Sequence, residues 1–163
     1  LIGALLFAFI PHIWEKINQK EEVKITQANL ILPNDKPQSI EIPILDLKME
    51  IKEASVSANN WEIYDNAVSW LKNSGDLKSG NMILYAHNDL SKFGKIIQLG
   101  QGSEIILKNQ WQEKHYKVID AFQTSNQDLW PIEAKENRLT MYTCSGLFDV
   151  NRFFVIAEPV EEN

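Results

Sequence analysis

Apolar and polar residues alternate along many short runs of this sequence, and a period of two is the pattern of a half-buried β-strand. The clearest run, SIEIPILDLKMEIKEASV, covers residues 39–56. Its apolar residues alternate with charged or polar ones and fall into two sets: Ile40, Ile42 and Ile44, then Leu47, Met49 and Ile51. Pro43 stands within the first set, between Ile42 and Ile44, and indicates an edge position or a bulge. We therefore expect two strands in this stretch.

The rest of the chain continues the same theme. Further short strands are expected at NMILYAH, SEIILKN, HYKVIDAFQ, LTMYTC and RFFVIAEP, which begin at residues 81, 103, 115, 139 and 152. Two stretches favour helix instead. YDNAVSWLKNSG (64–75) has apolar residues at helical spacing and ends at Gly75, and SKFGKIIQLGQG (91–102) predicts a helical turn with Phe93, Ile96, Ile97 and Leu99 inward. The sequence thus predicts a mainly β fold, a closed or nearly closed barrel of about eight strands with one or two short helices.

Length and charge limit the possible functions. The chain has 163 residues, enough for one core and an appendage. Its formal net charge of -6 argues against a surface that neutralises phosphates, so we do not expect a nucleic-acid partner. The turn-rich segment LPNDKPQ ends near residue 38. We expect residues 1–37 to be an appendage with a spacer, and residues 38–163 to form the barrel domain.

The first residues have a different character. LIGALLFAFI (1–10) is apolar throughout and is followed by Pro11 and a charged run. At about 1.5 Å per residue a helix of this length crosses roughly half of a bilayer core. We interpret it as the outer end of a membrane anchor or signal-anchor that begins before residue 1, with Trp14 at the interface. An amphipathic or core helix is the alternative interpretation.

Cys144 is the only cysteine of the chain, so no internal disulfide is possible. It closes the predicted strand LTMYTC, and the end of a barrel strand is a place where a side chain stands at a rim. A thiol of ordinary pKa is only a few per cent thiolate at pH 7, so a nucleophilic cysteine needs a base or a cation beside it. A small buried hydrophobic residue is the alternative interpretation of Cys144.

Two side chains are candidates for these partners. Of the three histidines, His12 lies in the predicted anchor and His115 stands between lysines on a strand, whereas His87 closes NMILYAH before the turn-prone NDLS. Arg152 follows the loop SGLFDVN, and a hairpin would bring it to the same rim as Cys144. There its planar donors would stabilise an oxyanion. Alternatively, His87 is a surface histidine and Arg152 pairs with Asp149 in the loop.

Taken together, these stretches resemble the sortases, the cysteine transpeptidases of bacterial cell surfaces. The resemblance rests on YAH after an apolar strand, LTMYTC closing another, and an arginine eight positions beyond the cysteine. IEIPIL resembles the family's opening strand, and FGKIIQLGQGSEIIL its Phe, Leu and Gly pattern before a strand. At four positions the residue differs from the one that many sortases have, which leaves the subclass and the peptide preference open: Ala86, Asn88, Ser103 and Tyr142.

The resemblance implies a sortase-like barrel and a set of roles. Cys144 would be the nucleophile that cleaves a Leu-Pro-x-Thr-Gly-like sorting signal through a thioester, His87 the acid and base, and Arg152 the oxyanion donor. Thr143 is assigned to substrate binding. The implied partners are secreted proteins with a C-terminal sorting signal and an amine on a peptidoglycan precursor or a pilin. The implied location is the cell membrane, with one N-terminal anchor and an extracellular catalytic domain.

No cofactor is expected. Some sortases bind calcium through acidic loop residues, and Asp89, Asp128 and Glu133 are available, but they lack the spacing of a calcium loop. One cysteine and few histidines give little support for zinc.

Two other functions compete with the transpeptidase. The L,D-transpeptidases also use cysteine and histidine, but they have glycine before the cysteine, where this chain has Thr143. A membrane-tethered barrel without enzymatic activity that binds a partner is the alternative from another class. It predicts a buried, unreactive Cys144 and a His87 that lies far from Arg152.

Overall fold

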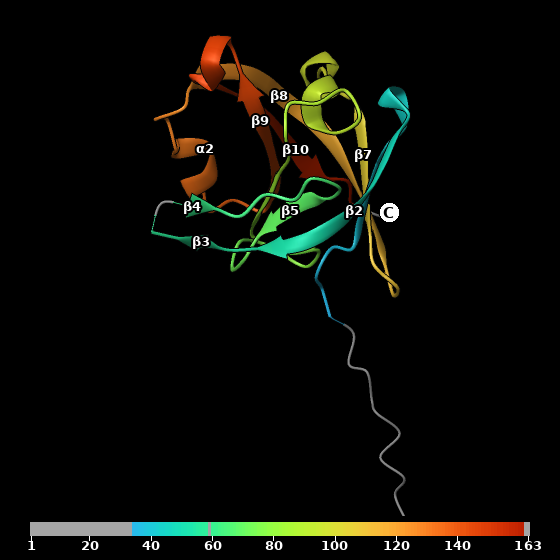
Figure 1. The fold of residues 1–163 in the computed structure, drawn as a ribbon. Coiled ribbons are helices and arrows are strands. Elements are labelled where there is room, and N and C mark those ends of the chain that lie inside the picture. Colours follow the sequence, from blue (N-terminus) through green and yellow to red (C-terminus); the bar gives the residue numbers. More distant parts are fainter. Residues whose placement is uncertain (1–33, 59, 162–163) are drawn as a thin grey trace, which may run out of the picture. The chain divides into compact units, whose positions relative to one another are not determined.

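The computed structural model describes residues 34–58 and 60–161. Eight strands close a barrel in the order β1-β2-β5-β6-β9-β10-β8-β7, and β3 and β4 form a separate two-stranded sheet (Figure 1). The strands are β1 (Ser39–Ile42), β2 (Leu47–Ala54), β3 (Val56–Ser57), β4 (Asn60–Trp61), β5 (Val68–Leu71), β6 (Asn81–Tyr85), β7 (Glu104–Lys108), β8 (Glu113–Ser125), β9 (Arg138–Ser145) and β10 (Asn151–Pro159). The helical segments are η1 (Pro43–Leu45), η2 (Phe93–Gln98), α2 (Trp130–Glu133) and η3 (Leu147–Asp149). The prediction of a mainly β, closed barrel is confirmed.

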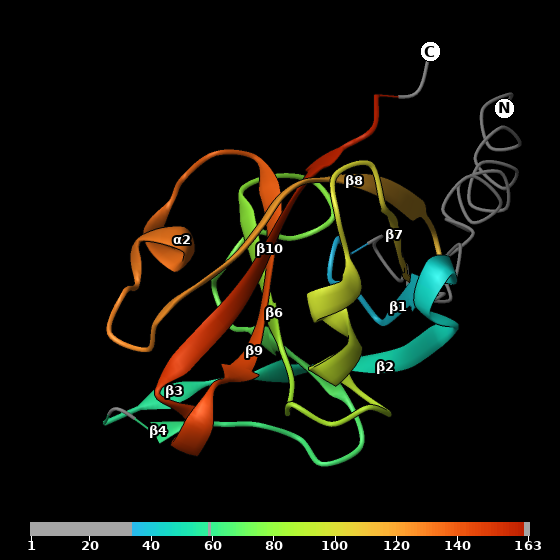
Figure 2. The ribbon, with the colours of Figure 1, turned by 90° about the horizontal axis from the view of Figure 1, so that it is seen from above.

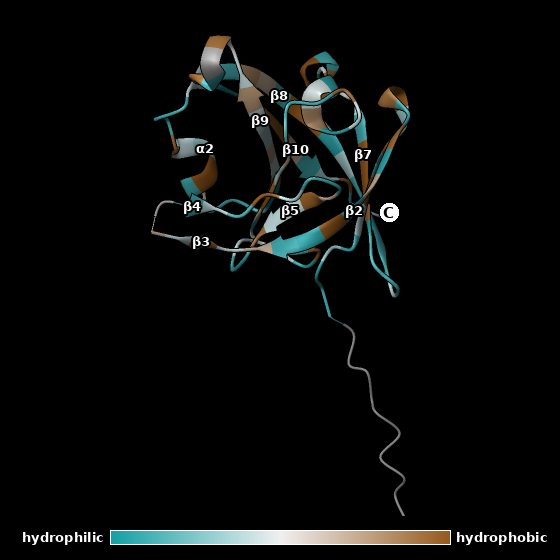
Figure 3. Ribbon diagram, in the orientation of Figure 1, coloured by the Kyte–Doolittle hydropathy of each residue, from teal (hydrophilic) through white to brown (hydrophobic). Residues whose placement is uncertain are grey.

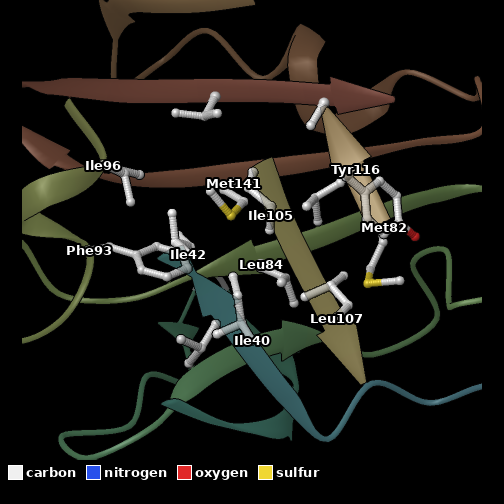
Figure 4. Packing of buried hydrophobic residues seen from close by; sticks show 14 of the residues in the cluster. Ile40, Ile42, Met82, Leu84, Phe93, Ile96, Ile105, Leu107, Tyr116 and Met141 are labelled. Carbon is white, nitrogen blue, oxygen red and sulfur yellow. The ribbon is translucent and has the colours of Figure 1, made fainter. Parts of the chain in front are cut away.

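The alternating residues build the core of the barrel. Their inward side chains are fully buried and converge from different strands, as Figure 4 shows for Ile40, Leu84, Leu107 and Met141. Hydrophobic and hydrophilic segments follow one another along the same strands when the ribbon is coloured by hydropathy (Figure 3). Burial of each large aliphatic side chain contributes about 1.5–3 kcal/mol. This packing fixes the register of the strands, because a slip by one residue would turn these side chains to the outside.

Residues 64–75 do not form the predicted helix. Val68–Leu71 is strand β5, parallel to β2 and antiparallel to β6. Val68, Ser69 and Trp70 are all buried, so β5 is covered on both faces and shows no alternation. Because a fully buried strand lacks the period of two, its apolar residues can match helical spacing by coincidence.

Two apolar side chains predicted to point inward lie outside. The chain leaves β1 at Pro43 and enters η1, which leaves the side chain of Ile44 71% exposed. The helical turn η2 is confirmed with Phe93, Ile96 and Leu99 buried, but Ile97 is 55% exposed. Both errors arise where a tight 3-10 turn rotates the side chains away from the expected face.

The predicted anchor and most of the spacer, residues 1–33, lie outside the described residues. The last spacer residues contact the barrel: the Asn109 side-chain amide donates to the Asn34 carbonyl (2.7 Å), and the Leu77 amide donates to the Asp35 carbonyl (2.8 Å). In the part of the chain that the structure describes, none of the helices has the length and apolar character needed to span a membrane.

Candidate active site

The hairpin of β9 and β10 places Cys144 directly opposite Arg152. The two residues are register partners in the antiparallel pair, so their side chains share one face of the sheet. Gly146 begins the connection with a φ of +77°, and a Cβ there would lie 2.8 Å from the Asn151 side-chain nitrogen. A glycine at this point therefore allows the turn that returns Arg152 to Cys144.

The parallel pairing of β6 with β9 places His87 next to Cys144, so that His87, Cys144 and Arg152 form one row. Its register ends at Tyr85 beside Tyr142, and the same offset continued by two residues sets His87 beside Cys144. The Thr143 hydroxyl fixes this continuation, because it donates to the Ala86 carbonyl at 2.9 Å. Thr143 itself is 1% exposed and borders neither of the cavities described next. The structure brings His87, Cys144 and Arg152 together, and it does not bring Thr143 to the substrate side.

One cavity opens on the His87 side of Cys144. It has a volume of about 390 Å³ and is lined by Asp65, His87, Asn88, Asp89, Lys92, Cys144 and Asp149. His87 Nε2 lies 3.6 Å from the Asp65 carboxylate. Hydrogen bonds from Ser91 hold the pKa of Asp89 below its usual value, which keeps that carboxylate charged. Three carboxylates against Lys92 make this cavity attractive to a cation.

A second cavity opens on the Arg152 side of Cys144. Its volume is about 180 Å³, and it is mostly apolar. The lining residues are Trp61, Ile63, Tyr85, Asn126, Asp128, Leu129, Ile132, Tyr142, Cys144, Arg152 and Phe154. Cys144 is thus the residue shared by both cavities.

Aromatic rings form the floor of the apolar cavity. Tyr85 and Tyr142 stack with their ring centroids 5.2 Å apart, and Trp61 meets both edge-on at 5.5 and 6.2 Å. Phe154 continues the floor at 5.4 Å from Tyr142. Burial raises the pKa of Tyr85 to about 12, so its hydroxyl remains a neutral donor.

The walls of this cavity come from two connections, which lie on the same side of the barrel in both views (Figures 1 and 2). The β3–β4 hairpin is held by the Tyr85 hydroxyl, which donates to the Glu62 carbonyl at 2.7 Å. The segment around α2 is held by Asn81, whose side-chain amide donates to the carbonyls of Pro131 (2.9 Å) and Ala134 (3.1 Å). Ile63 and Ile132 are thereby fixed at the cavity.

The charge state of Cys144 depends on its neighbours. Partial burial raises the pKa of the Cys144 thiol, the Arg152 guanidinium lowers it, and the Asp149 carboxylate raises it. In the part of the chain that the structure describes, no hydrogen bond joins the side chains of His87 and Cys144. The thiol is therefore mostly protonated near pH 7, and its reactivity is expected to rise with pH.

Arg152 is anchored through one nitrogen. Its Nη1 donates to the backbone carbonyls of Asp149 (2.8 Å) and Asn151 (2.9 Å). The predicted alternative was an ion pair with the Asp149 carboxylate, but the contact is with the carbonyl of that residue. Since a guanidinium has five N–H groups, Nε and Nη2 remain for a ligand in the apolar cavity that Arg152 borders.

Comparison with known proteins assigns this arrangement to a family. The sortase domain model matches residues 40–160, about three quarters of the chain, including all three residues of the row. The chain belongs to the sortase family. Sortases are transpeptidases, which is the general activity that the family supports.

Solved sortases share the fold at low identity. Sortase C-1 from Actinomyces oris is 22% identical over 76% of this chain and 73% of its own, with a TM-score of 0.63. Sortase C from Streptococcus pneumoniae is 18% identical over 83% and 74%, with a TM-score of 0.67. Sortase A from Listeria monocytogenes is 20% identical over 78% and 89%, with a TM-score of 0.66. No curated protein sequence matches the chain.

The site of this sortase disagrees with the non-enzymatic alternative, which predicted a buried, unreactive Cys144 and a His87 that lies far from Arg152. Cys144 is only partly buried and is the partner of Arg152 in the register. The residues considered for calcium do not converge: Asp89 and Asp128 line different cavities, and Glu133 borders neither of them. Within residues 34–58 and 60–161, no three potential His, Cys, Asp or Glu ligands form a group suited to a metal.

Several residues of the site escaped sequence reasoning. Trp61 and Asp65 come from the segment between β2 and β5, whose short strands carry no periodic signal. Trp130 stacks on Phe122 at 5.2 Å and lines neither of the two cavities. The aromatic residue Tyr142 was visible as an unusual neighbour of the Thr-Cys pair, and it is part of the floor.

Proposed function

We propose that this sortase cleaves a Leu-Pro-x-Thr-Gly-like sorting signal through a thioester on Cys144 and transfers the acyl group to an amine. The observation that carries the proposal is the single row of His87, Cys144 and Arg152, which adjacent strands place at the meeting point of two cavities. A transferase of this kind needs two approaches to one nucleophile, one for the acyl donor and one for the acceptor. The two cavities supply them.

In the first half-reaction, the Cys144 thiolate attacks the carbonyl carbon of the bond to be cleaved. A C–S bond forms, and the N–H groups of Arg152 hold the oxyanion. The C–N bond then breaks, and protonated His87 gives its proton to the departing amine. The donor peptide before the cleaved bond lies in the apolar cavity, because the departing amine must leave on the His87 side.

In the second half-reaction, an amine enters the cavity that His87 lines. The neutral amine attacks the thioester carbon, His87 takes its extra proton, and the C–S bond breaks to release the thiolate. Asp65, Asp89 and Asp149 favour an acceptor that arrives as an ammonium ion. A peptidoglycan precursor amine and a pilin lysine both fit this chemistry, and water in their place gives slow hydrolysis.

The proposed setting is the outer face of the cell membrane. The apolar residues 1–10 serve as the end of an N-terminal anchor, and the catalytic domain is extracellular. The partners are secreted proteins with a C-terminal sorting signal. No cofactor is included in the proposed chemistry, since the three groups of the row suffice for acid, base, nucleophile and oxyanion donor.

The test is product formation from a sorting-signal peptide and a small amine, followed by mass spectrometry. Cys144→Ala is expected to abolish the new amide without changing the melting temperature much. Ser145→Ala is the matched control, because Ser145 is the next residue on β9, is buried on the opposite face and has no hydrogen-bond partner for its hydroxyl. Amide formation by Cys144→Ala at the wild-type rate would refute the proposed role of the thiol.

A further inference from the structure

Another cavity lies beside the α2 segment (residues 130–135). It has a volume of about 360 Å³ and is bordered by the two ends of the β5–β6 connection and by Ile132, Ala134 and Lys135 of the α2 segment. Ile132 also lines the apolar cavity at Cys144. The α2 segment is therefore a wall that the two cavities share.

Two lysines line this cavity, hereafter the lysine cavity. They are Lys72 and Lys135, and none of the described lining residues is an aspartate or a glutamate. Lys72 Nζ lies 3.6 Å from the Glu53 carboxylate, but Glu53 also pairs with Lys36, so one carboxylate serves two ammonium groups. Within residues 34–58 and 60–161, Lys135 takes part in no ion pair. The lysine cavity thus has an excess of positive charge, although the whole chain has a formal net charge of -6.

The acidic residues nearest to Lys135 in the sequence do not cancel this charge. Neither Glu133 nor Glu136 lines the lysine cavity, and the Glu136 carboxylate lies 3.9 Å from the Arg138 guanidinium. An anion in the cavity would therefore meet two ammonium groups without an opposing carboxylate among the described lining residues.

The backbone adds hydrogen-bond donors on a fixed floor. Asn73, Gly80 and Lys135 line the cavity, and among the described residues their amides donate to no backbone carbonyl. The two ends of the β5–β6 connection are in close contact, because a Cβ on Gly75 would lie 2.4 Å from the Gly80 carbonyl carbon. The Gly75 amide also donates to the Asn81 carbonyl at 2.7 Å. Backbone amides in a concave turn are a common surface for anion binding.

A phosphate group fits these features better than a carboxylate. It carries a charge of about -1.5 to -2 as a monoester and offers three strong acceptor oxygens, so lysines from two segments can contact the same group. The lysine ammonium is a compact point charge and a common ligand of phosphate. A volume of about 360 Å³ also leaves room for part of the molecule that carries the phosphate, either a soluble ester or a lipid headgroup.

We infer that the lysine cavity binds a phosphate group and that the bound group stabilises the α2 wall of the apolar cavity. A phosphate held by Lys72 on the barrel and Lys135 on the α2 segment fastens that segment in addition to the hydrogen bonds from Asn81. Because Ile132 lines both cavities, a fixed α2 segment favours peptide binding in the apolar cavity. The effect on the peptide rests on the proposed function, whereas the phosphate site does not.

The first test is an NMR titration of the 15N-labelled full chain with sodium phosphate at pH 7 and constant ionic strength. We expect saturable shifts of the Asn73, Gly80 and Lys135 amides, which sodium chloride alone does not produce. Lys135→Gln and Lys72→Gln should each weaken the binding by at least about fivefold, because each removes a charged donor at an exposed site. Lys78→Gln is the matched control, because Lys78 is exposed in the same connection and does not line the cavity.

The same titration with dihexanoyl-phosphatidylglycerol, below its micelle concentration, distinguishes the sources of the phosphate. Tighter binding of this lipid than of inorganic phosphate would assign the cavity to a lipid headgroup, and tighter binding of inorganic phosphate would assign it to a soluble phosphate. The absence of saturable shifts with both probes would overturn the inference. Shifts that persist unchanged in both Lys135→Gln and Lys72→Gln would overturn it as well.

The second test measures how phosphate changes the affinity for a sorting-signal peptide. Cys144→Ala binds the peptide without chemistry, and saturating phosphate should lower its dissociation constant by about fivefold, the lower end of typical coupling between two sites. The added Lys135→Gln substitution should remove this effect. Peptide affinity that is independent of bound phosphate would refute the coupling. If the wild-type protein forms no thioester and Cys144→Ala binds no peptide, the proposed function and the coupling both fail, whereas the NMR titration still decides the phosphate site.

Discussion

Replacing Arg152 by lysine separates the charge of this residue from its shape. In the structure, Nη1 holds the carbonyls of Asp149 and Asn151, and the other guanidinium nitrogens remain for the substrate. A lysine ammonium has its three donors on one atom, so it cannot hold both loop carbonyls and also direct two donors at an oxyanion. At least one hydrogen bond between a charged donor and the oxyanion is lost.

The loss of one hydrogen bond to the oxyanion sets the size of the effect of Arg152→Lys on the rate. One hydrogen bond to a charged group contributes about 1.5–3 kcal/mol, which corresponds to a loss of roughly 10- to 150-fold in the rate of acylation. The positive charge beside Cys144 remains, so the pH at which the thiol becomes reactive should change little in Arg152→Lys. Arg152→Ala should lose the charge as well, and the reactive pH should move upward because Arg152 lowers the pKa of Cys144.

Two assays on the same variants measure these effects. Thioester formation with a sorting-signal peptide gives kcat/KM, and iodoacetamide alkylation between pH 6 and pH 10 gives the titration of the thiol. Below the pKa the neutral thiol reacts slowly with iodoacetamide, and above the pKa the thiolate reacts fast. An Arg152→Lys variant with more than half of the wild-type kcat/KM, or an Arg152→Ala variant with an unshifted alkylation profile, would refute this reasoning.

Two further predictions concern stability and its dependence on pH. Asn81→Ala should lower the free energy of unfolding by about 2–4 kcal/mol in urea denaturation, because it removes the buried amide that holds α2 and accepts a hydrogen bond from Thr140; a loss below about 0.5 kcal/mol would contradict that role. His115 lies between Glu104 and Glu113, which raise its pKa, Glu104 more strongly. Its folded pKa is above the unfolded value, so its contribution to stability is complete below the unfolded pKa of about 6.5 and is lost as pH rises through the folded pKa. The melting temperature of His115→Gln should therefore fall further below wild type at pH 6 than at pH 9, and an equal difference at both pH values would exclude the ion pairs as the cause.

The barrel and the pairing of Cys144 with Arg152 could be predicted because their signals are local. Ile40, Ile42 and the residues of LTMYTC show their strands through alternation or an apolar run, and both patterns survive in the fold. The partnership of Cys144 with Arg152 follows from a hairpin with a short connection, which constrains the register.

The remaining parts depend on contacts between distant segments. His87 reaches Cys144 through a parallel pairing between strands that are 57 residues apart in the chain, and no local pattern encodes such a pairing. β5 was missed because burial on both faces removes its alternation. Trp61 was missed because β3 and β4 are two residues each, too short to show a period.

The central claim is that Cys144 carries the acyl group between two cavities. It is tested most directly by the intact mass of the full chain, quenched in acid at short times after mixing with a sorting-signal peptide, with and without an added amine. The account predicts a mass increase equal to the acyl fragment, located on Cys144, that decays faster as the amine concentration rises while a new amide accumulates. An unmodified chain at all times in the presence of product, or an adduct on a residue other than Cys144, would contradict the account.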